Sequence, residues 1–388
     1  MQLLFSYSWR NVFKRRMTLI LTVTGVALVV FVFSAVRMLS HGLNRTLVDT
    51  GHDGNVTIIR RAAQTEVSSI LPRSMGNIVK TDVGIARDSA DRPLVTGELL
   101  VLISQPKRGS GESGNVPVRG TTEISFILRP EVKLIEGRLP RPGTAEIMAG
   151  AKLARNFQGC GVGETVRFGA RDWEVVGVFE ANGAGFESEL WGDYDQFADA
   201  FERPIYSSLT ARLATPEEFA AMKDRLENDP RLTVEIDREK EYYAKQSRFT
   251  RTYITVLGSI ISFIFGFGAI FGAMITMYAA VANRTTEIGT LRALGFSRLT
   301  VLLTFLAESL TIALLGGVLG VVVAYFLRFF EVSTTNWDTF SELAFSFEIS
   351  PSIILEALVF VVIMGLLGGF LPAARAASMR IVNSLRAR

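Results

Sequence analysis

Long apolar stretches limit this chain to folds that a lipid bilayer can accommodate. The first, residues 17–36, reads MTLILTVTGVALVVFVFSAV and carries no charge. As a helix rising about 1.5 Å per residue it covers about 30 Å, the thickness of the hydrocarbon layer, so it is interpreted as a retained anchor and not as a cleaved signal peptide. Three more such stretches follow, from Tyr253 to Ala282, from Leu299 to Leu327 and from Pro351 to about Ala374. With a mean hydropathy of +0.29, the sequence predicts four membrane-spanning helices.

The distribution of lysine and arginine predicts the orientation of these helices. Basic residues precede the first stretch, separate the second from the third, and follow the fourth: Arg10, Lys14, Arg15 and Arg16; Arg284, Arg292 and Arg298; Arg375, Arg380, Arg386 and Arg388. The loop between the third and fourth stretches instead contains Glu331, Asp338, Glu342 and Glu348, with only Arg328. Because short cytoplasmic loops are enriched in lysine and arginine, we expect both termini and residues 283–298 to be cytoplasmic. The segment from about 41 to 250 then lies outside.

This long segment has the sequence patterns of a mixed α and β domain. In the stretch ETVRFGARDWEVVGVFE, Val166 and Phe168 alternate with polar residues, a turn follows, and Trp173 and Phe179 lie on one face. The pattern predicts a β-hairpin. Roughly two hundred residues are enough for an independent core. The predicted fold class is therefore a membrane α-helical protein with four transmembrane helices and a large α+β extracytoplasmic domain inserted between the first and second spans.

Residues for catalysis or metal binding are scarce. Cys160 is the only cysteine, and His41 and His52 are the only histidines, so we expect neither a disulfide nor a metal centre. The loop PKRGSGESGNVP has the glycine spacing of a phosphate-binding loop, but Asn115 stands where the lysine is required. The net charge of +3 comes from basic residues beside apolar runs, which does not indicate a nucleic-acid partner. No catalytic, cofactor-binding or metal-binding residue is predicted.

Two features of the apolar runs leave alternatives open. Glycines recur at the spacing that lets helices approach closely in lipid: Gly268 and Gly272; Gly316, Gly317 and Gly320; Gly365, Gly368 and Gly369. They serve packing within the chain or a contact with a second copy. Glu308 lies within the third run, where an ionised carboxylate is costly, so we expect it to face a polar seam between helices, to be protonated or to relay protons.

The cytoplasmic loop NRTTEIGTLRALGFSR, residues 283–298, predicts a short amphipathic helix. Thr285 or Thr286 is expected to cap its N-terminus, Glu287 and Arg292 complement the helix dipole, and Gly295 suits a left-handed C-terminal cap. The apolar side contains Ile288, Leu291 and Leu294. A helix of about eight residues is not stable alone, so this side must be held by another surface. That surface is either a cytoplasmic partner or the lipid headgroups.

This loop closely resembles the coupling-helix signature of the MacB/FtsX/LolC-like ABC transporter permeases, of the form R-T-x-E-I-G-x-x-R-A-x-G. The resemblance extends to both ends of the chain, in the stretches SWRNVFKRRMTLILTVTGVAL and GGFLPAARAASMRIVNSLR. The external stretch from EGRLPRPGTAEIMAG to WEVVGVFEANGAG is also similar to that family's external domain. The chain departs from the family pattern at Ala374, Ile381 and Asn383.

The resemblance implies a permease subunit driven by a cytoplasmic ABC ATPase dimer that holds the ATP and magnesium, so no cofactor is expected in this chain. It also implies a second permease copy or a homologous permease, contact with membrane lipids, a periplasmic adaptor or lipoprotein cargo, and a place in the bacterial cytoplasmic (inner) membrane. The residues expected to couple to the ATPase are Arg284, Thr286, Glu287, Ile288, Gly289, Leu291, Arg292 and Gly295.

The predicted organisation has an N-terminal segment and four spans, and each span is followed by a loop, a domain or a tail. In chain order the segments are 1–16 (cytoplasmic), 17–40 (first span), 41–250 (external domain), 251–282 (second span), 283–298 (coupling loop), 299–328 (third span), 329–350 (external loop), 351–375 (fourth span) and 376–388 (cytoplasmic tail).

Three functions are compatible with this organisation. The first is mechanical extraction or export of a lipoprotein, lipid, peptide or drug, driven by the ATPase. The second is an FtsX-like regulator that activates an extracytoplasmic cell-wall hydrolase, and the third is a membrane-anchored enzyme. The resemblance favours the first, because the external segment is longer than division-type regulators have.

Overall fold

The computed structural model describes residues 16–48, 50–246, 248–335, 339–379 and 381, which form two compact units. The helical unit lies within Met1–His41, Tyr253–Phe330 and Ser346–Arg388. The α+β unit lies within Gly42–Thr252 and Glu331–Phe345. Apart from Arg16, the predicted segment 1–16 falls outside the described residues, as do positions 380 and 382–388 of the predicted tail.

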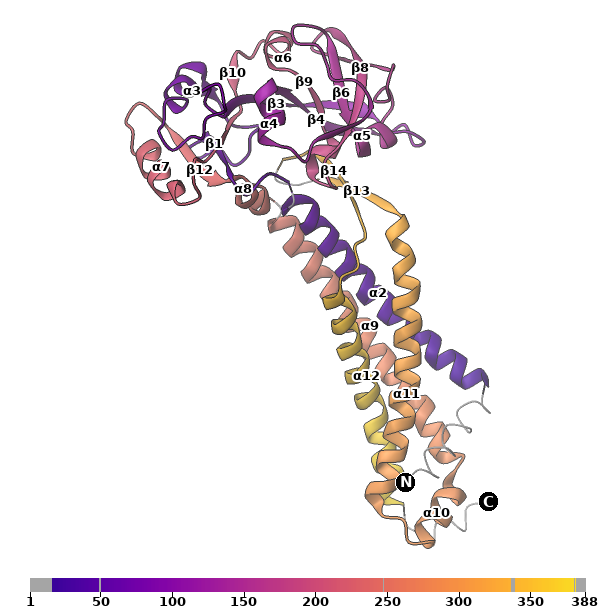
Figure 1. Ribbon diagram of the computed structural model, residues 1–388. Helices are drawn as coiled ribbons and strands as arrows, with labels where there is room; N and C mark the ends of the chain where they lie inside the picture. Colours follow the sequence, from indigo (N-terminus) through magenta and orange to yellow (C-terminus); the bar gives the residue numbers. More distant parts are fainter. Residues whose placement is uncertain (1–15, 49, 247, 336–338, 380, 382–388) are drawn as a thin grey trace. The chain divides into compact units, whose positions relative to one another are not determined.

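The helical unit consists mainly of long apolar helices (Figure 1). They are α2 (Arg16–Val48), α9 (Arg248–Ala282), α11 (Arg298–Tyr325), continued by the 3-10 turn η2 (Phe326–Phe329), and α12 (Pro351–Ser378); the short helix α10 (Thr285–Ala293) links α9 to α11. Within the described residues, four helices are long and apolar enough to cross a membrane. The four predicted spans are therefore confirmed, although α2 runs eight residues beyond the predicted end at residue 40.

Glycines set the spacing between three of these helices. A Cβ atom at Gly320 of α11 would lie 2.6 Å from the carbonyl oxygen of Ala27 in α2, and one at Gly369 of α12 would lie 2.5 Å from the Cβ of Ser309 in α11. A Cβ atom does not fit at such distances, so these glycines let the helices approach more closely than larger residues would. Gly268 and Gly272 of α9 have no such neighbour within 4 Å. The glycines of α11 and α12 therefore serve packing within the chain, whereas the role of Gly268 and Gly272 remains open.

The α+β unit is built on a sheet that is ten-stranded within the described residues (Figure 1). The strand order is β12-β1-β11-β3-β4-β9-β6-β8-β5, with β7 pairing to β8. The bounds are β1 (Asn55–Arg60), β3 (Val95–Pro106), β4 (Ser113–Thr121), β5 (Lys133–Gly137), β6 (Glu146–Gly150), β7 (Thr165–Phe168), β8 (Arg171–Glu180), β9 (Leu190–Asp193), β11 (Ser208–Arg212) and β12 (Val234–Arg238). The pairs β4–β9 and β6–β8 are parallel, and the others are antiparallel. The predicted hairpin is confirmed as β7 and β8, joined by a turn at Gly169 and Ala170.

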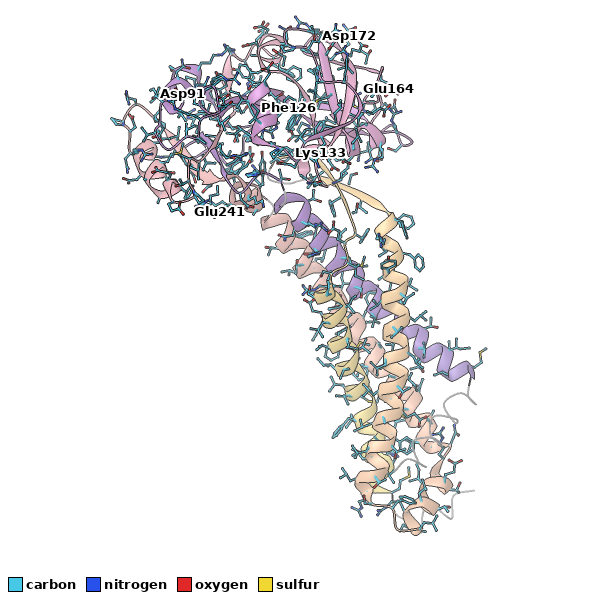
Figure 2. All side chains as sticks on the ribbon, viewed as in Figure 1. Asp91, Phe126, Lys133, Glu164, Asp172 and Glu241 are labelled. Atoms are coloured by element: carbon cyan, nitrogen blue, oxygen red, sulfur yellow. The ribbon has the colours of Figure 1, made fainter. Side chains whose placement is uncertain are left out.

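Strand β3 holds the two halves of this sheet together. Its first residues, Val95–Glu98, pair with β11, and its remaining residues pair with β4. Shorter elements join the strands or cover the sheet: α3 (Arg73–Val79), α4 (Glu123–Leu128), α5 (Ala151–Asn156), η1 (Gly185–Ser188), α6 (Tyr194–Ala200), α7 (Glu218–Glu227), α8 (Glu239–Gln246), and the two-stranded sheet of β2 (Leu71–Pro72) and β10 (Ile205–Tyr206). Trp173 and Phe197 are fully buried in the main core. Charged side chains such as Asp91, Asp172 and Glu241 stay at the surface (Figure 2).

A second hairpin joins the α+β unit from a distant part of the sequence. It consists of β13 (Glu331–Thr335) and β14 (Glu342–Ser346), in the segment predicted as a simple external loop. Glu342 is buried and forms an ion pair with Lys107, while the Ala344 amide donates to the Ser188 hydroxyl at 3.3 Å. The loop between the third and fourth spans is therefore part of the α+β unit.

A cluster of buried charges lies inside the α+β unit, and we call it the Arg119–Arg129 cluster. It contains these two arginines and the carboxylates of Glu66, Glu98, Glu189 and Glu239, all with side chains less than 10% exposed. Arg119 contacts Glu66 and Glu98 at 2.9 Å and Glu189 at 2.7 Å, and Arg129 contacts Glu98 and Glu239. Burial raises the pKa of Glu98, but the attraction of Arg129 and Arg119 outweighs it, so the net pKa is lowered.

Candidate functional site: the short helix α10

Helix α10 begins almost immediately after α9. Arg284 is its N-cap residue, and the Arg284 carbonyl accepts the first helical hydrogen bond from the Ile288 amide at 3.0 Å. The prediction that Thr285 or Thr286 caps the helix is wrong, because both lie inside the first turn. The Thr285 hydroxyl donates instead to the Ala282 carbonyl at 2.6 Å. It thereby satisfies a carbonyl at the end of α9, which the close succession of the two helices leaves within reach.

The C-terminal end of α10 has the predicted glycine. Gly295 has a φ of +94°, the left-handed conformation that glycine adopts without steric cost. The Phe296 amide donates to the Leu291 carbonyl and the Gly295 amide to the Arg292 carbonyl, each at 3.2 Å. These two bonds form a Schellman motif. The turn then leads directly into α11, so both ends of α10 are fixed by hydrogen bonds.

One face of α10 packs against the ends of its own neighbouring helices. Ile288 is 1% exposed and lies in a cluster with residues of α9, α11 and α12, namely Met277, Val281, Val301, Phe305, Ala373, Ala376 and Ala377. Gly289 is also buried, and Leu291 is half-buried. The prediction that a cytoplasmic partner or the lipid headgroups hold the apolar side of Ile288, Leu291 and Leu294 is therefore wrong for Ile288, which this chain itself buries. The pattern gives an apolar face, but much of that face is covered by this chain itself.

The opposite face of α10 is open. Thr286, Glu287, Thr290 and Ala293 are exposed, and Leu294 is 74% exposed. We call these five residues the outward face of α10. An exposed leucine beside a carboxylate and two hydroxyls can bury apolar surface and accept or donate directional hydrogen bonds at once.

The two arginines predicted to couple point to their own chain. Arg292 is half-buried, and its Nη1 donates to the Phe296 carbonyl at 3.0 Å, within the C-terminal turn. Arg284 is 8% exposed, and its Nη1 lies 3.0 Å and 3.3 Å from the two carboxylate oxygens of Glu308. Glu308 thus lies in a polar seam between helices, one of the alternatives that the sequence left open. Its partner Arg284 lies outside the predicted spans, so counting charged residues within the spans does not reveal the pair.

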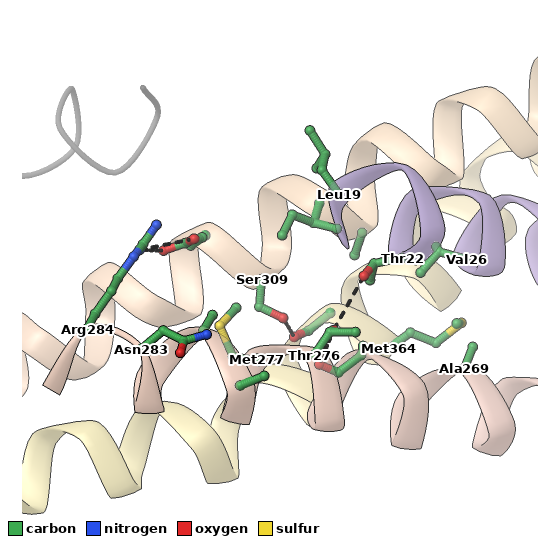
Figure 3. A pocket seen from close by; sticks show the side chains of 17 residues that line it. Leu19, Thr22, Val26, Ala269, Thr276, Met277, Asn283, Arg284, Ser309 and Met364 are labelled. Atoms are coloured by element: carbon green, nitrogen blue, oxygen red, sulfur yellow. Dashed lines mark hydrogen bonds and ion pairs between the residues drawn. The ribbon is translucent and has the colours of Figure 1, made fainter. Parts of the chain in front are cut away.

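Arg284 and Glu308 also line a cavity of about 120 Å³ between α2, α9, α11 and α12 (Figure 3). Its polar lining includes Thr22 and Thr276, whose hydroxyls lie 3.4 Å apart, and Ser309, which donates to the Gly365 carbonyl at 2.8 Å. The remaining lining is mostly apolar, with Leu19, Val26 and Met364 among it.

Comparison with known protein families identifies the chain. Residues 17–229 match the MacB-like periplasmic core domain, and residues 259–381 match the FtsX-like permease C-terminal region. The chain is an ABC transporter permease of the MacB/FtsX type. It is thus a membrane protein with a large extracytoplasmic domain, which is the α+β unit.

Individual relatives show how much of the permease is shared. The uncharacterized ABC transporter permease YknZ of Bacillus subtilis is 26% identical over 58% of this chain and 57% of its own length. The macrolide export ATP-binding/permease protein MacB of Chromobacterium violaceum is 28% identical over 58% of this chain but only 35% of its own length. The uncharacterized ABC transporter permease YvrN of Bacillus subtilis is 23% identical over 98% of both chains.

Proposed function

We propose that this chain is a permease subunit that transmits ATP binding and hydrolysis in a separate ATPase to its extracytoplasmic domain, to extract or export a lipoprotein, lipid, peptide or drug. The outward face of α10 carries this proposal. Helix α10 is fixed at both ends, one of its faces packs on three membrane helices, and the other face is open. A displacement of α10 by a partner can therefore be transmitted to the membrane helices. The proposed location is the inner membrane of a bacterium, with both termini and α10 on the cytoplasmic side.

The geometry of the glycine-rich loop supports an ATPase on another chain. Phosphate-binding loops join a strand to a helix, whereas here β3 and β4 form an antiparallel hairpin in which Asn115 pairs with Ser104. Lys107, the lysine of this loop, forms an ion pair with Glu342. The proposed partner is therefore a cytoplasmic ATPase dimer that holds the ATP and magnesium.

Export is favoured over activation of a cell-wall hydrolase by the relatives. The MacB relative is named for macrolide export, and it carries its ATP-binding part in the same protein. The proposed second permease copy would contact the open side of α9, where Gly268 and Gly272 leave room for a closely packed helix.

The decisive experiment places a charge on the outward face of α10. Leu294→Asp should reduce co-purification of the ATPase from native membranes by about tenfold or more, because an unpaired charge would enter the contact. Glu287→Ala should have a smaller effect, because it removes a single hydrogen-bonding group. The matched control is Leu299→Asp, which changes a 64% exposed leucine in the first turn of α11, outside α10.

The outcome also separates the alternatives. A wild-type chain that brings no ATPase from its membrane would refute the proposed function. If the ATPase is present but Leu294→Asp and Glu287→Ala both leave its amount and its hydrolysis unchanged, α10 is not the docking site. Leu291→Asp is less informative, because Leu291 is half-buried against the bundle and its substitution would disturb the helix itself.

A further inference from the structure

The Arg284–Glu308 ion pair connects α10 to a point far along α11. Glu308 lies ten residues after Arg298, the first residue of α11, which corresponds to about 15 Å along the helix axis. The turn from Leu294 to Ser297 connects α10 to the start of the same helix. In addition to the apolar packing of Ile288, helix α10 is thus attached to α11 by the chain at one end and by the ion pair at the other.

Two separated attachments behave differently from one. A single turn is a hinge, because rotation about a few backbone dihedrals lets α10 tilt while α11 stays in place. A second attachment about 15 Å away removes that freedom, since tilting α10 would pull Arg284 from Glu308. Both side chains are at most 10% exposed, so separating them would leave two charges with little water around them.

Helix α11 in turn is joined to its neighbours close to Glu308. Ser309, the next residue, donates to the Gly365 carbonyl of α12. Further along, Gly320 packs against the backbone of Ala27 in α2. A displacement of Glu308 therefore moves α12 and α2 as well as α11.

We propose that the Arg284–Glu308 pair is a latch that makes α10 and α11 tilt as one rigid body. Arg284 and Glu308 are positioning residues, and neither contacts the ATPase. The inference rests on the proposed function in that α10 receives the motion of an ATPase, but the latch itself is a property of this chain alone.

The latch is tested by the spread of distances between spin labels on α10 and α11. The labels replace Thr290, which is exposed on α10, and Leu315, which is 38% exposed on α11, in a chain whose Cys160 is changed to serine. The full chain is measured in lipid nanodiscs without any ATPase. Glu308→Gln should broaden the distance distribution about twofold, because the charged contact would be lost and α10 would be held to α11 only by the turn and by the apolar contacts of Ile288. An unchanged distribution would overturn the latch.

Further variants exclude a general loss of structure. Arg284→Gln should broaden the distribution as Glu308→Gln does, and it serves as the test if Glu308→Gln fails to insert. The double variant should be no broader than either single variant, because all three remove one shared interaction. Additive broadening would mean that the residues act separately and would overturn the latch. The matched control is Glu356→Gln, which removes the other described ion pair between spans, with Arg37, and should leave the distribution unchanged.

A last measurement distinguishes the latch from docking. Glu308→Gln should retain the ATPase within about twofold in the co-purification experiment, because Glu308 is buried away from the outward face of α10. If Glu308→Gln abolishes co-purification of the ATPase but leaves the distribution of label distances unchanged, the Arg284–Glu308 pair serves docking of the ATPase, and the latch is overturned. If the wild-type chain binds no ATPase, the proposed function fails, whereas the label distances still decide the latch.

Discussion

The two units both bury arginine against glutamate, but they do so in different ways. In the α+β unit, Arg119 and Arg129 each contact at least two carboxylates. Those carboxylates also accept hydrogen bonds from Ser208, Trp191 and Asn55. In the helical unit, Arg284 Nη1 contacts both carboxylate oxygens of Glu308. A network in which each buried charge shares several partners specifies one structure more strongly than a smaller set of contacts does.

The apolar packing of the two units also differs. The α+β core is filled by large aromatic rings, with Trp173 stacked on Phe168 at 5.0 Å between ring centroids and Phe197 edge-on to Trp173 at 4.8 Å. Such interlocked rings resist relative motion. The helical unit packs through glycines, which give a smooth contact between backbones. The difference indicates a rigid external domain and a bundle whose helices can be displaced.

The largest predicted effect comes from opening the Arg119–Arg129 cluster. Arg119→Met would leave Glu66 and Glu189 without their arginine and Glu98 with Arg129 alone, so the α+β unit should lose about 3–5 kcal/mol of stability. Thermal unfolding of the full chain in detergent, followed by near-UV circular dichroism of Trp173 and Trp191, measures this loss. The control is Arg138→Met. It removes the exposed ion pair between Arg138 and Glu146, and this loss should change the melting temperature little. Equal losses in both variants would show that the cluster is no more important than a surface pair.

A smaller effect is predicted for the glycine contacts of the bundle. Gly320→Leu would force a side chain against the backbone of Ala27, at a cost of about 1–3 kcal/mol. Thermal loss of far-UV helical signal in detergent measures it. Gly268→Leu is the control, because no atom lies within 4 Å of a Cβ at that position. If the two variants melt alike, the glycines of α11 do not set the helix spacing.

The smallest predicted effect is a gain in stability at Glu131. This carboxyl is half-buried, its Oε1 has no hydrogen-bond partner in the described structure, and burial raises its pKa. A raised pKa in the folded state favours the protonated form, so the stability it provides in acid is lost as the pH rises through that pKa. At pH 8, Glu131→Gln should therefore unfold at a higher temperature than the wild type, and its free energy of unfolding should be larger by less than about 1 kcal/mol. At pH 4 the melting temperatures of Glu131→Gln and the wild type should differ less than at pH 8. A stability gain of Glu131→Gln that is larger at pH 4 than at pH 8 would contradict a raised pKa of Glu131.

The sequence by itself determined the elements whose signal is local. The four spans follow from uninterrupted apolar runs, because backbone groups in lipid must be paired within a helix. The hairpin of β7 and β8 follows from alternating residues around Gly169, and the end of α10 follows from Gly295. These features depend on neighbours within a few positions, so no knowledge of the fold is needed to predict them.

The tertiary structure decided what each face of those elements contacts. Helical periodicity placed Ile288 and Leu294 on one apolar side, yet Ile288 is buried by α9, α11 and α12 while Leu294 is exposed. Arg284 was expected to face a partner and instead faces Glu308, 24 positions away. The hairpin of β13 and β14 joins a unit that precedes it by many residues. In each case the deciding contact is between residues distant in sequence, and only the packed chain brings them within the few ångströms over which ion pairs and apolar contacts act.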